Sequence, residues 1–384
     1  MSDAEQRLAA TLGPQPAALA ALVGALRSGP VAAYLLEGPA GTGKAAAARA
    51  FAAELLAAEA PDPDDTRRRA LVVPSPHPDL VWLEPPGTQH LVETVREQII
   101  RQAAFRPFEG ARRVFVVDEA HALREESQNA LLKTLEEPPA FAHFLLVSSE
   151  PEALLETVVS RCAHARFAPL SVAAIDEQLA DLGVDGAERQ AAARLAGGDL
   201  RRARFLLTAE GRGLRASIEQ IGTALSTGNA ASAPWGQIVS EAAAVGRQAA
   251  DEAQQRLQVE LGDLPSRSRE SRRLEREAQE LAKRAERRRR TDTLGLALAL
   301  LARWVRDLGV CAAGAEIHAF NVDRLEALGA AAAGLDPGAA RDGALMVAET
   351  RRRLDLNVNE ELALEALMFR LEPVLSARTR VPAP

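Results

Sequence analysis

The stretch Leu35-Leu36-Glu37-Gly38-Pro39-Ala40-Gly41-Thr42-Gly43-Lys44-Ala45 decides the fold of this chain. An apolar run over residues 31–36 predicts a buried strand, and an alanine-rich helix is expected to begin near Lys44. The spacing of Gly38, Gly43 and Lys44 is typical of a phosphate loop, in which glycines let backbone N–H groups and a helix N-terminus face an anion. Strand, loop and helix together predict a nucleotide-binding α/β fold.

The loop departs from the pattern at one position. The residue after the lysine should be Ser or Thr, because that hydroxyl holds the Mg²⁺ that bridges the β and γ phosphates. Ala45 has no oxygen to offer. We therefore expect weak or absent binding of ATP and Mg²⁺, and no cofactor that the protein requires.

Composition excludes several classes of protein. At 384 residues the chain is long enough for two or three domains. A net charge of −7 does not favour a strongly basic nucleic-acid binder. The two cysteines, Cys162 and Cys311, cannot form a disulfide framework or a four-cysteine zinc site. The N-terminus has no apolar signal core, and no run of about 18 uncharged apolar residues occurs. We expect a cytoplasmic protein without a membrane contact.

Strands and helices alternate over residues 30–170, which predicts one α/β domain with a parallel sheet. The polar, proline-containing residues 61–69 are expected to form a loop. His77 precedes the second strand and is interpreted as a turn residue, because no partner has the spacing of a metal ligand. The expected helices are 16–27, 44–59, 92–104 and 127–137, and the expected strands are 31–36, 80–83, 114–117, 144–147 and 166–167.

Polar residues follow two of the expected strands. Asp118 and Glu119 come directly after residues 114–117. Carboxyl ends of parallel strands lie where such sheets bind ligands. Asp118 is thus expected to hold Mg²⁺, directly or through water, and Glu119 to polarise an attacking water. An acidic helix cap is the alternative. Ser149 ends the next strand, where it would either sense a γ-phosphate or cap the strand.

The motifs taken in order resemble the bacterial sliding-clamp loader, a branch of the AAA+ proteins. They are Gly38–Lys44, His77-Pro78-Asp79, Val117–Ala120, the run Asn129–Pro139 with its Leu-Leu-Lys-Thr-Leu-Glu-Glu-Pro-Pro, and Ser160-Arg161-Cys162. The resemblance is strong over about residues 30–210 and weaker from there to the end. It implies three domains: an AAA+ α/β domain with a degenerate phosphate loop over residues 1–169, a helical lid over 170–210 and an all-α collar for oligomerisation over 211–384.

The resemblance also implies which kind of subunit this is. The ATP-hydrolysing subunits of the family keep the Ser or Thr that Ala45 replaces, whereas delta-prime subunits often carry a degraded loop and do not hydrolyse ATP. Residues 356–367 resemble delta-prime as well. The implied function is that of a non-hydrolysing subunit of DNA polymerase III that helps to load the sliding clamp on primed DNA. Its implied partners are the gamma/tau and delta subunits in a pentamer, the clamp, and primed DNA through the assembled complex.

The family usually carries a four-cysteine zinc module before the His-Pro-Asp turn. Residues 60–76 contain no cysteine. We therefore expect the zinc to be absent and this segment to be reduced to a loop.

Two arginines receive roles from the resemblance. Arg161, in Ser-Arg-Cys, is implied to be an arginine finger that reaches a neighbouring subunit's ATP site, and the alternative is a structural pair with a carboxylate such as Glu156. Arg202, with Arg201 as the second choice, is implied to be a phosphate sensor on the lid, and the alternative is a solvated helix start. The nucleotide-binding or vestigial set is Gly38, Gly41, Gly43, Lys44, Asp118, Glu119, Ser149 and Arg202, without a metal-ligand set.

Two other functions remain open. An active, gamma/tau-like ATPase of the same loader would use Lys44, Asp118 and Glu119, with water in place of the missing hydroxyl; Ala45 argues against it. A stand-alone DNA-binding module would use Arg287–Arg290. The acidic total and the lack of interleaved aromatics argue against that module, and residues 267–290 are expected to be the solvated face of a long helix. Helices are also expected over 294–308 and 360–371.

Overall fold

The computed structural model divides the chain into two compact units, which are described separately. The residues that the structure describes are 2–85, 89–261, 269–354 and 358–377. The first unit comprises Met1–Ala174 and Gly198–Leu200, and the second comprises Ile175–Gly197 and Arg201–Pro384. The three domains predicted with boundaries at 169/170 and 210/211 stay a prediction.

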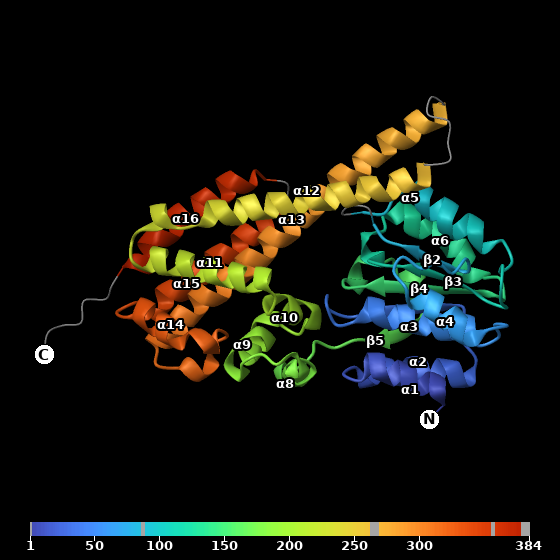
Figure 1. The fold of residues 1–384 in the computed structure, drawn as a ribbon, viewed down its shortest axis with the longest axis horizontal. Helices are drawn as coiled ribbons and strands as arrows, with labels where there is room; N and C mark the ends of the chain where they lie inside the picture. Colours follow the sequence, from blue (N-terminus) through green and yellow to red (C-terminus); the bar gives the residue numbers. More distant parts are fainter. Residues whose placement is uncertain (1, 86–88, 262–268, 355–357, 378–384) are drawn as a thin grey trace, which may run out of the picture. The chain divides into compact units, whose positions relative to one another are not determined.

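The first unit is built on a five-stranded parallel sheet with the strand order β2-β3-β4-β1-β5 (Figure 1). The strands are β1 (Ala33–Glu37), β2 (Leu80–Leu83), β3 (Arg113–Val117), β4 (Ala142–Ser148) and β5 (Ala163–Arg166). Every residue of β3 and β4 is buried. Continuous apolar runs of this kind belong to parallel strands that are covered on both faces.

Successive residues of a strand point into two different cores. Leu36 and Val116 pack with Phe51 of α3 (Lys44–Ala57) in one core, and Leu35 and Phe115 pack in the other. This alternation follows from the period of two in a β-strand. Within the sheet, Glu37 of β1 pairs with Ser148 of β4. The residues that follow these strands are thereby brought to one edge.

The helices of the first unit include three that the sequence did not predict, α1, α4 and α7. They are α1 (Asp3–Leu12), α2 (Pro16–Ser28), α3 (Lys44–Ala57), α4 (Pro63–Leu71), α5 (Val92–Thr94) with a π-helical continuation over Val95–Arg101, α6 (Glu125–Glu136) and α7 (Glu156–Val159), with 3-10 turns at Ala120–Ala122 and Pro151–Ala153. Helix α1 begins with a capping box in which Ser2 and Glu5 exchange hydrogen bonds.

Helix α4 contradicts the loop that was predicted over residues 61–69. The Asp62 carboxylate accepts a hydrogen bond from the Asp65 N–H at 3.0 Å and so caps the helix. Pro63 occupies the first turn, where a helix needs no N–H donor. The proline that was interpreted as a break therefore marks a helix start.

Every secondary-structure element assigned to the described residues of the second unit is a helix, and turns and loops join these helices. Its elements are the end of α8 (Val172–Gln178), α9 (Gly186–Ala196), α10 (Leu200–Leu206), α11 (Ala209–Ser226), α12 (Trp235–Leu261), α13 (Arg269–Ala312), α14 (Leu325–Ala332), α15 (Pro337–Leu354) and α16 (Glu360–Ser376), with 3-10 turns at Ala180–Leu182, Ala230–Ser232, Glu316–His318 and Val322–Arg324. The long helices α12 and α13 pack along each other (Figure 1).

The charged segment that ends at Arg290 lies on α13. Arg287 and Arg289 are exposed, and Arg290 forms an ion pair with Glu360. The described part of the segment is thus helical, and its role as a solvated face stays a prediction. Residues 267–268 at its start, and residues 356–357 of the delta-prime-like run, lie outside the described residues.

Candidate functional site

The predicted phosphate loop joins β1 to α3 at the carboxyl edge of the sheet. Gly38, Gly41 and Gly43 have φ values of 140°, 75° and 92°. L-residues rarely adopt such a backbone, which explains why glycines occupy these positions. The strand, turn and helix lie in the order that the sequence predicted.

Lys44 lies folded onto its own loop. Its Nζ donates hydrogen bonds to the carbonyl oxygens of Gly38 at 2.5 Å and Pro39 at 2.6 Å, and the residue is only 6% exposed. The hydroxyl of Thr42 also donates to Pro39, at 2.9 Å. Both groups are thus bonded to carbonyls of the loop itself.

Three residues that the sequence reasoning missed pack against this loop. Gln15, 4% exposed, donates to the carbonyls of Thr42 at 3.3 Å and Ala168 at 2.8 Å. A Cβ at Gly38 would lie 2.1 Å from the carbonyl oxygen of Phe167, and one at Gly41 would lie 1.8 Å from Cγ of Asp199. No local pattern signals these contacts, since Gln15 and Asp199 are remote from the loop in sequence.

Three features of the loop bear on whether it could hold a nucleotide with Mg²⁺. The carboxylate of Asp199 lies against Gly41, the ammonium of Lys44 is bonded to loop carbonyls, and Ala45 offers no hydroxyl for the metal.

The predicted acidic pair lies directly after β3 at the same edge. Asp118 Oδ1 accepts a hydrogen bond from the Glu119 N–H at 2.9 Å. Glu119 has φ 50°, and among the described residues it is the one non-glycine with a positive φ. Such strain costs about 1–3 kcal/mol and is concentrated at functional sites.

His90 forms a hydrogen bond with the main chain of this turn. Its Nε2 lies 2.8 Å from the carbonyl oxygen of Asp118 and must donate, because a carbonyl can only accept. The Nδ1 atom is buried without a hydrogen-bond partner. Burial lowers the pKa of His90, so the neutral ring is the form that the fold prefers.

Ser149 lies beside a histidine that was not predicted. Its Oγ is 3.3 Å from Nε2 of His121, which belongs to the turn that follows Glu119. The structure therefore brings the loop, the acidic pair and Ser149 to one edge, as the parallel topology requires. The position of His121, three residues after Asp118, was the available signal.

Arg161 is held by its own chain through a carboxylate different from the one suggested by the sequence. Its guanidinium donates to Glu136 Oε1 at 2.5 Å and to the carbonyl of Thr157 at 2.7 Å. The alternative interpretation had named Glu156. The side chains of Arg161 and Glu136 are 33% and 48% exposed, and ion pairs at such sites contribute about 0–1 kcal/mol.

Arg202 belongs to the second unit and bonds within it. Its guanidinium donates to the carbonyl of Ala196 at 3.2 Å, at the end of α9, whereas Arg201 is exposed. Arg303 lies nearby: burial, together with the charges of Arg202 and Arg351, lowers its pKa to about 10. The predicted sensor role of Arg202 stays a prediction.

The described residues include no group of metal ligands, and burial makes the Cys162 thiol hard to ionise. Within them, no three His, Cys, Asp or Glu side chains are grouped to hold a metal ion. His77 accepts a hydrogen bond from the Asp79 N–H at 3.1 Å, which agrees with its interpretation as a turn residue. Burial raises the pKa of the Cys162 thiol to about 12, so thiolate chemistry is disfavoured.

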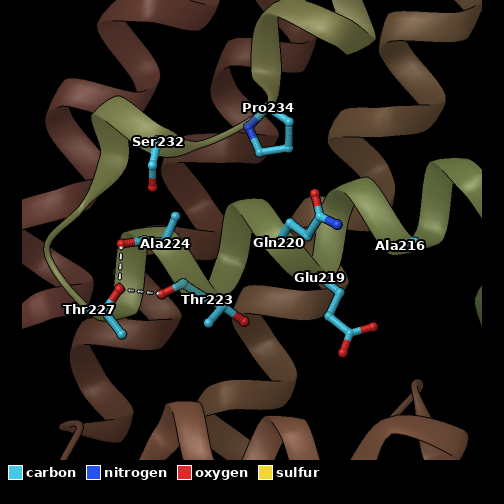
Figure 2. A pocket seen from close by; sticks show the side chains of 8 residues that line it. All are labelled: Ala216, Glu219, Gln220, Thr223, Ala224, Thr227, Ser232 and Pro234. Carbon is cyan, nitrogen blue, oxygen red and sulfur yellow. Dashed lines mark hydrogen bonds between the residues drawn. The ribbon is translucent and has the colours of Figure 1, made fainter.

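A hollow of about 580 Å³ lies along α11, in the second unit (Figure 2). Of its polar groups, the hydroxyl of Thr227 bonds to the carbonyls of Thr223 and Ala224, and Glu219 forms an ion pair with Arg324 at 3.4 Å. The hollow contains none of the predicted site residues. Its lining is Ala216, Glu219, Gln220, Thr223, Ala224, Thr227, Ser232 and Pro234.

No helix in the described part of the chain is both long and apolar enough to span a bilayer.

Comparison with known proteins finds similarity to subunits of DNA polymerase III over part of the chain. Residues 14–171 match the family model described as DNA polymerase III, delta subunit. The chain is 39% identical over 139 residues to the delta' subunit of Pseudomonas aeruginosa, with 34% of this chain and 42% of that one covered. It is 31% identical over 152 residues to the delta' subunit of Bacillus subtilis, with 38% and 45% covered.

Tau and gamma subunits of DNA polymerase III are similar as well. Identity to the tau/gamma subunit of Haemophilus influenzae is 33% over 153 residues, which are 39% of this chain and 22% of that one. In each case the chain spans less than half the length of the curated relative. A solved gamma-subunit-related protein from Thermotoga maritima aligns over 92% of this chain and 99% of its own, with 15% identity and a TM-score of 0.40.

Proposed function

We propose that residues 14–171 form the AAA+ domain of a DNA polymerase III clamp-loader subunit. From this premise, the whole chain works as a non-hydrolysing, delta-prime-like member of that loader. Its partners would be the gamma/tau and delta subunits, the sliding clamp and, through the assembled complex, primed DNA in the cytoplasm. Ala45 carries this proposal, because the Mg²⁺-holding hydroxyl is missing. The hydrogen bonds that Lys44 donates to the carbonyls of Gly38 and Pro39 support it, because they hold the ammonium on its own loop.

ATP turnover by the purified chain, alone and with its loader partners, tests the proposal. We expect negligible turnover by the chain alone. Ala45→Ser should improve Mg²⁺-dependent nucleotide binding without producing turnover, because a hydroxyl alone does not displace the groups packed on the loop. A wild-type rate near ~1 s⁻¹, the lower end of common enzyme rates, would overturn this proposal.

Such a rate would favour the active gamma/tau-like ATPase. The edge formed by Asp118, Glu119 and Ser149 supports that second candidate, since these are the groups that would hold metal and water. The same turnover assay therefore separates the two functions.

Arg161 would supply its charge to a neighbouring subunit's ATP site. Arg161 is exposed and its ion pair with Glu136 is weak, so separating it from Glu136 costs little free energy. Arginine fingers raise hydrolysis rates by ~10³–10⁵. Lysine should substitute poorly, because it lacks the planar fork that spans two oxygens.

Three variants in the assembled loader test the finger. Arg161→Ala should lower the clamp- and DNA-stimulated ATPase, whereas Glu136→Gln, which breaks only the ion pair, should leave it intact. Arg124→Ala removes another arginine of the first unit, one that bonds to Gln89, and serves as the matched control. If Arg161→Ala and Glu136→Gln have the same effect on turnover and on melting temperature, Arg161 is a structural partner only.

A further inference from the structure

The carboxylate of Asp199 lies on the phosphate loop. An added Cβ at Gly41 would meet Asp199 Cγ at 1.8 Å, Oδ2 at 2.0 Å and Oδ1 at 2.3 Å. All three atoms of the acid group therefore lie at one face of the loop. A phosphate loop receives anions through its backbone N–H groups, and here a fixed anion of the protein is beside that backbone.

The segment that carries Asp199 is anchored to the first unit. The N–H of Leu170 donates to the carbonyl of Gly198 at 3.3 Å, and residues 198–200 belong to the same compact unit as the loop. Gln15 donates hydrogen bonds to the carbonyls of Thr42, in the loop, and of Ala168. The loop and the residues that contact it are thus tied together by main-chain carbonyls.

We propose that Asp199 excludes nucleotide phosphates from the loop. Its carboxylate occupies space against Gly41 and carries the same sign of charge as a phosphate. A phosphate would have to displace the carboxylate and draw Lys44 away from the carbonyls of Gly38 and Pro39. The inference deepens the proposed function, because it adds a barrier to nucleotide binding that is independent of Ala45.

Calorimetric titration of the full chain with Mg²⁺–ATP, pyrophosphate and adenosine tests the exclusion. Asp199→Ala should raise the affinity for ATP and pyrophosphate at least tenfold and leave that for adenosine unchanged. Asp199→Asn removes the charge but keeps the volume, so its gain should be smaller. Asp181→Asn, an exposed acid in the 3-10 turn Ala180–Leu182, is the charge-matched control and should match the wild type. Affinities within twofold of wild type in both Asp199 variants would overturn the proposal.

A double-mutant cycle tests the contact itself. Gly41→Ala should lower the melting temperature strongly in the wild type, because its Cβ collides with the carboxylate. In the Asp199→Ala background, where only the cost of φ 75° remains, the loss should be at most half as large. Equal losses in both backgrounds would show that the carboxylate does not rest on Gly41 in solution.

Asp199 also immediately precedes α10, where an acidic residue suits a helix start. If its substitution lowers the melting temperature and leaves phosphate affinity unchanged, capping is its role and the exclusion is wrong. The outcomes are separable from the proposed function. Asp199→Ala should still show no turnover because Ala45 remains, whereas turnover by the wild type would contradict the proposed function without deciding what Asp199 does.

Discussion

At the scale of single residues, the glycines of the phosphate loop have unequal roles. Gly38 approaches the main chain of Phe167 so closely that a Cβ would lie 2.1 Å from its carbonyl oxygen. Gly43 faces open space, with nothing within 4 Å of the corresponding position. Both have a positive φ, so backbone strain is common to the two sites and collision is confined to Gly38.

Gly38→Ala should therefore destabilise the protein more than Gly43→Ala. Left-handed backbone costs an L-residue about 1–2 kcal/mol, which is the loss expected for Gly43→Ala. Collision with the Phe167 carbonyl should add about 1–3 kcal/mol at Gly38. Urea unfolding of the two variants measures the difference. Equal losses would mean that the chain at Phe167 yields without cost.

At the scale of an element, α4 shows how side chains far apart in sequence stabilise a short helix. Arg67 of α4 and Arg7 of α1 both bond to Glu54 of α3, at 3.1 Å and 2.6 Å. The Glu54 side chain is only 5% exposed. A buried carboxylate between two arginines thus joins three helices.

Glu54→Ala should cost about 2–4 kcal/mol in the free energy of unfolding, because it leaves two guanidinium groups without their buried partner. The matched control is Glu59→Ala, which breaks the ion pair between Glu59 and Arg112. The Glu59 side chain is 59% exposed, so this loss should cost about 0–1 kcal/mol. Chemical denaturation compares the two. A Glu54 variant as stable as the Glu59 variant would contradict this account of α4.

The same segment carries the prediction about zinc. Residues 60–76 form α4 and its flanks and contain no cysteine, and α4 is tied down by ion pairs. We expect elemental analysis of the purified protein to find no stoichiometric zinc, since structural sites need four ligands. One zinc per chain, or a melting temperature lowered by a chelator, would reveal a site formed by other residues.

At the scale of the whole molecule, buried histidines connect stability to pH. His90 is 1% exposed and His143 is 5% exposed, and burial lowers the pKa of both. His90 is near Asp118, Glu119 and His121, and His143 is near Arg112. Each ring uses one nitrogen on a carbonyl, of Asp118 and Val31 respectively.

Stability should fall as the pH is lowered from about 7 to 5.5. The unfolded chain binds protons at its histidines near pH ~6.5, whereas the folded protein keeps these rings neutral to lower pH. Their contribution is complete above the unfolded pKa and is lost toward the folded pKa, at up to about 1.4 kcal/mol per pH unit for each group. Urea unfolding across this range measures the slope.

The double variant His90→Gln, His143→Gln should reduce the slope, because glutamine can donate to the same carbonyls without titrating. Part of the slope should remain, because burial also lowers the pKa of His77. His318→Gln, at an exposed position, is the control and should leave the slope unchanged. The ion pair of Glu5 and Arg27 affects stability at lower pH, because the hydrogen bond from Arg27 lowers the pKa of Glu5 to about 2. A slope as steep in the double variant as in the wild type would assign the pH dependence to other groups.

The amino-acid sequence determined the α/β class, the order of the elements and the edge at which Asp118, Glu119 and Ser149 would meet. Apolar runs and glycine spacing are local signals, and parallel pairing then brings the strand ends together. Helix α4 was predicted wrongly because the same proline is compatible with a break and with a first helical turn.

The tertiary structure alone decided which side chains cover that edge. Gln15 bonds to residue 168, Arg161 to Glu136 and not Glu156, and Asp199 lies on Gly41. No periodicity encodes these contacts, because each joins residues that only the packing of the folded chain brings together. Strands and turns follow from backbone preferences over a few residues, whereas the surroundings of the phosphate loop depend on where the whole first unit places distant parts of the chain.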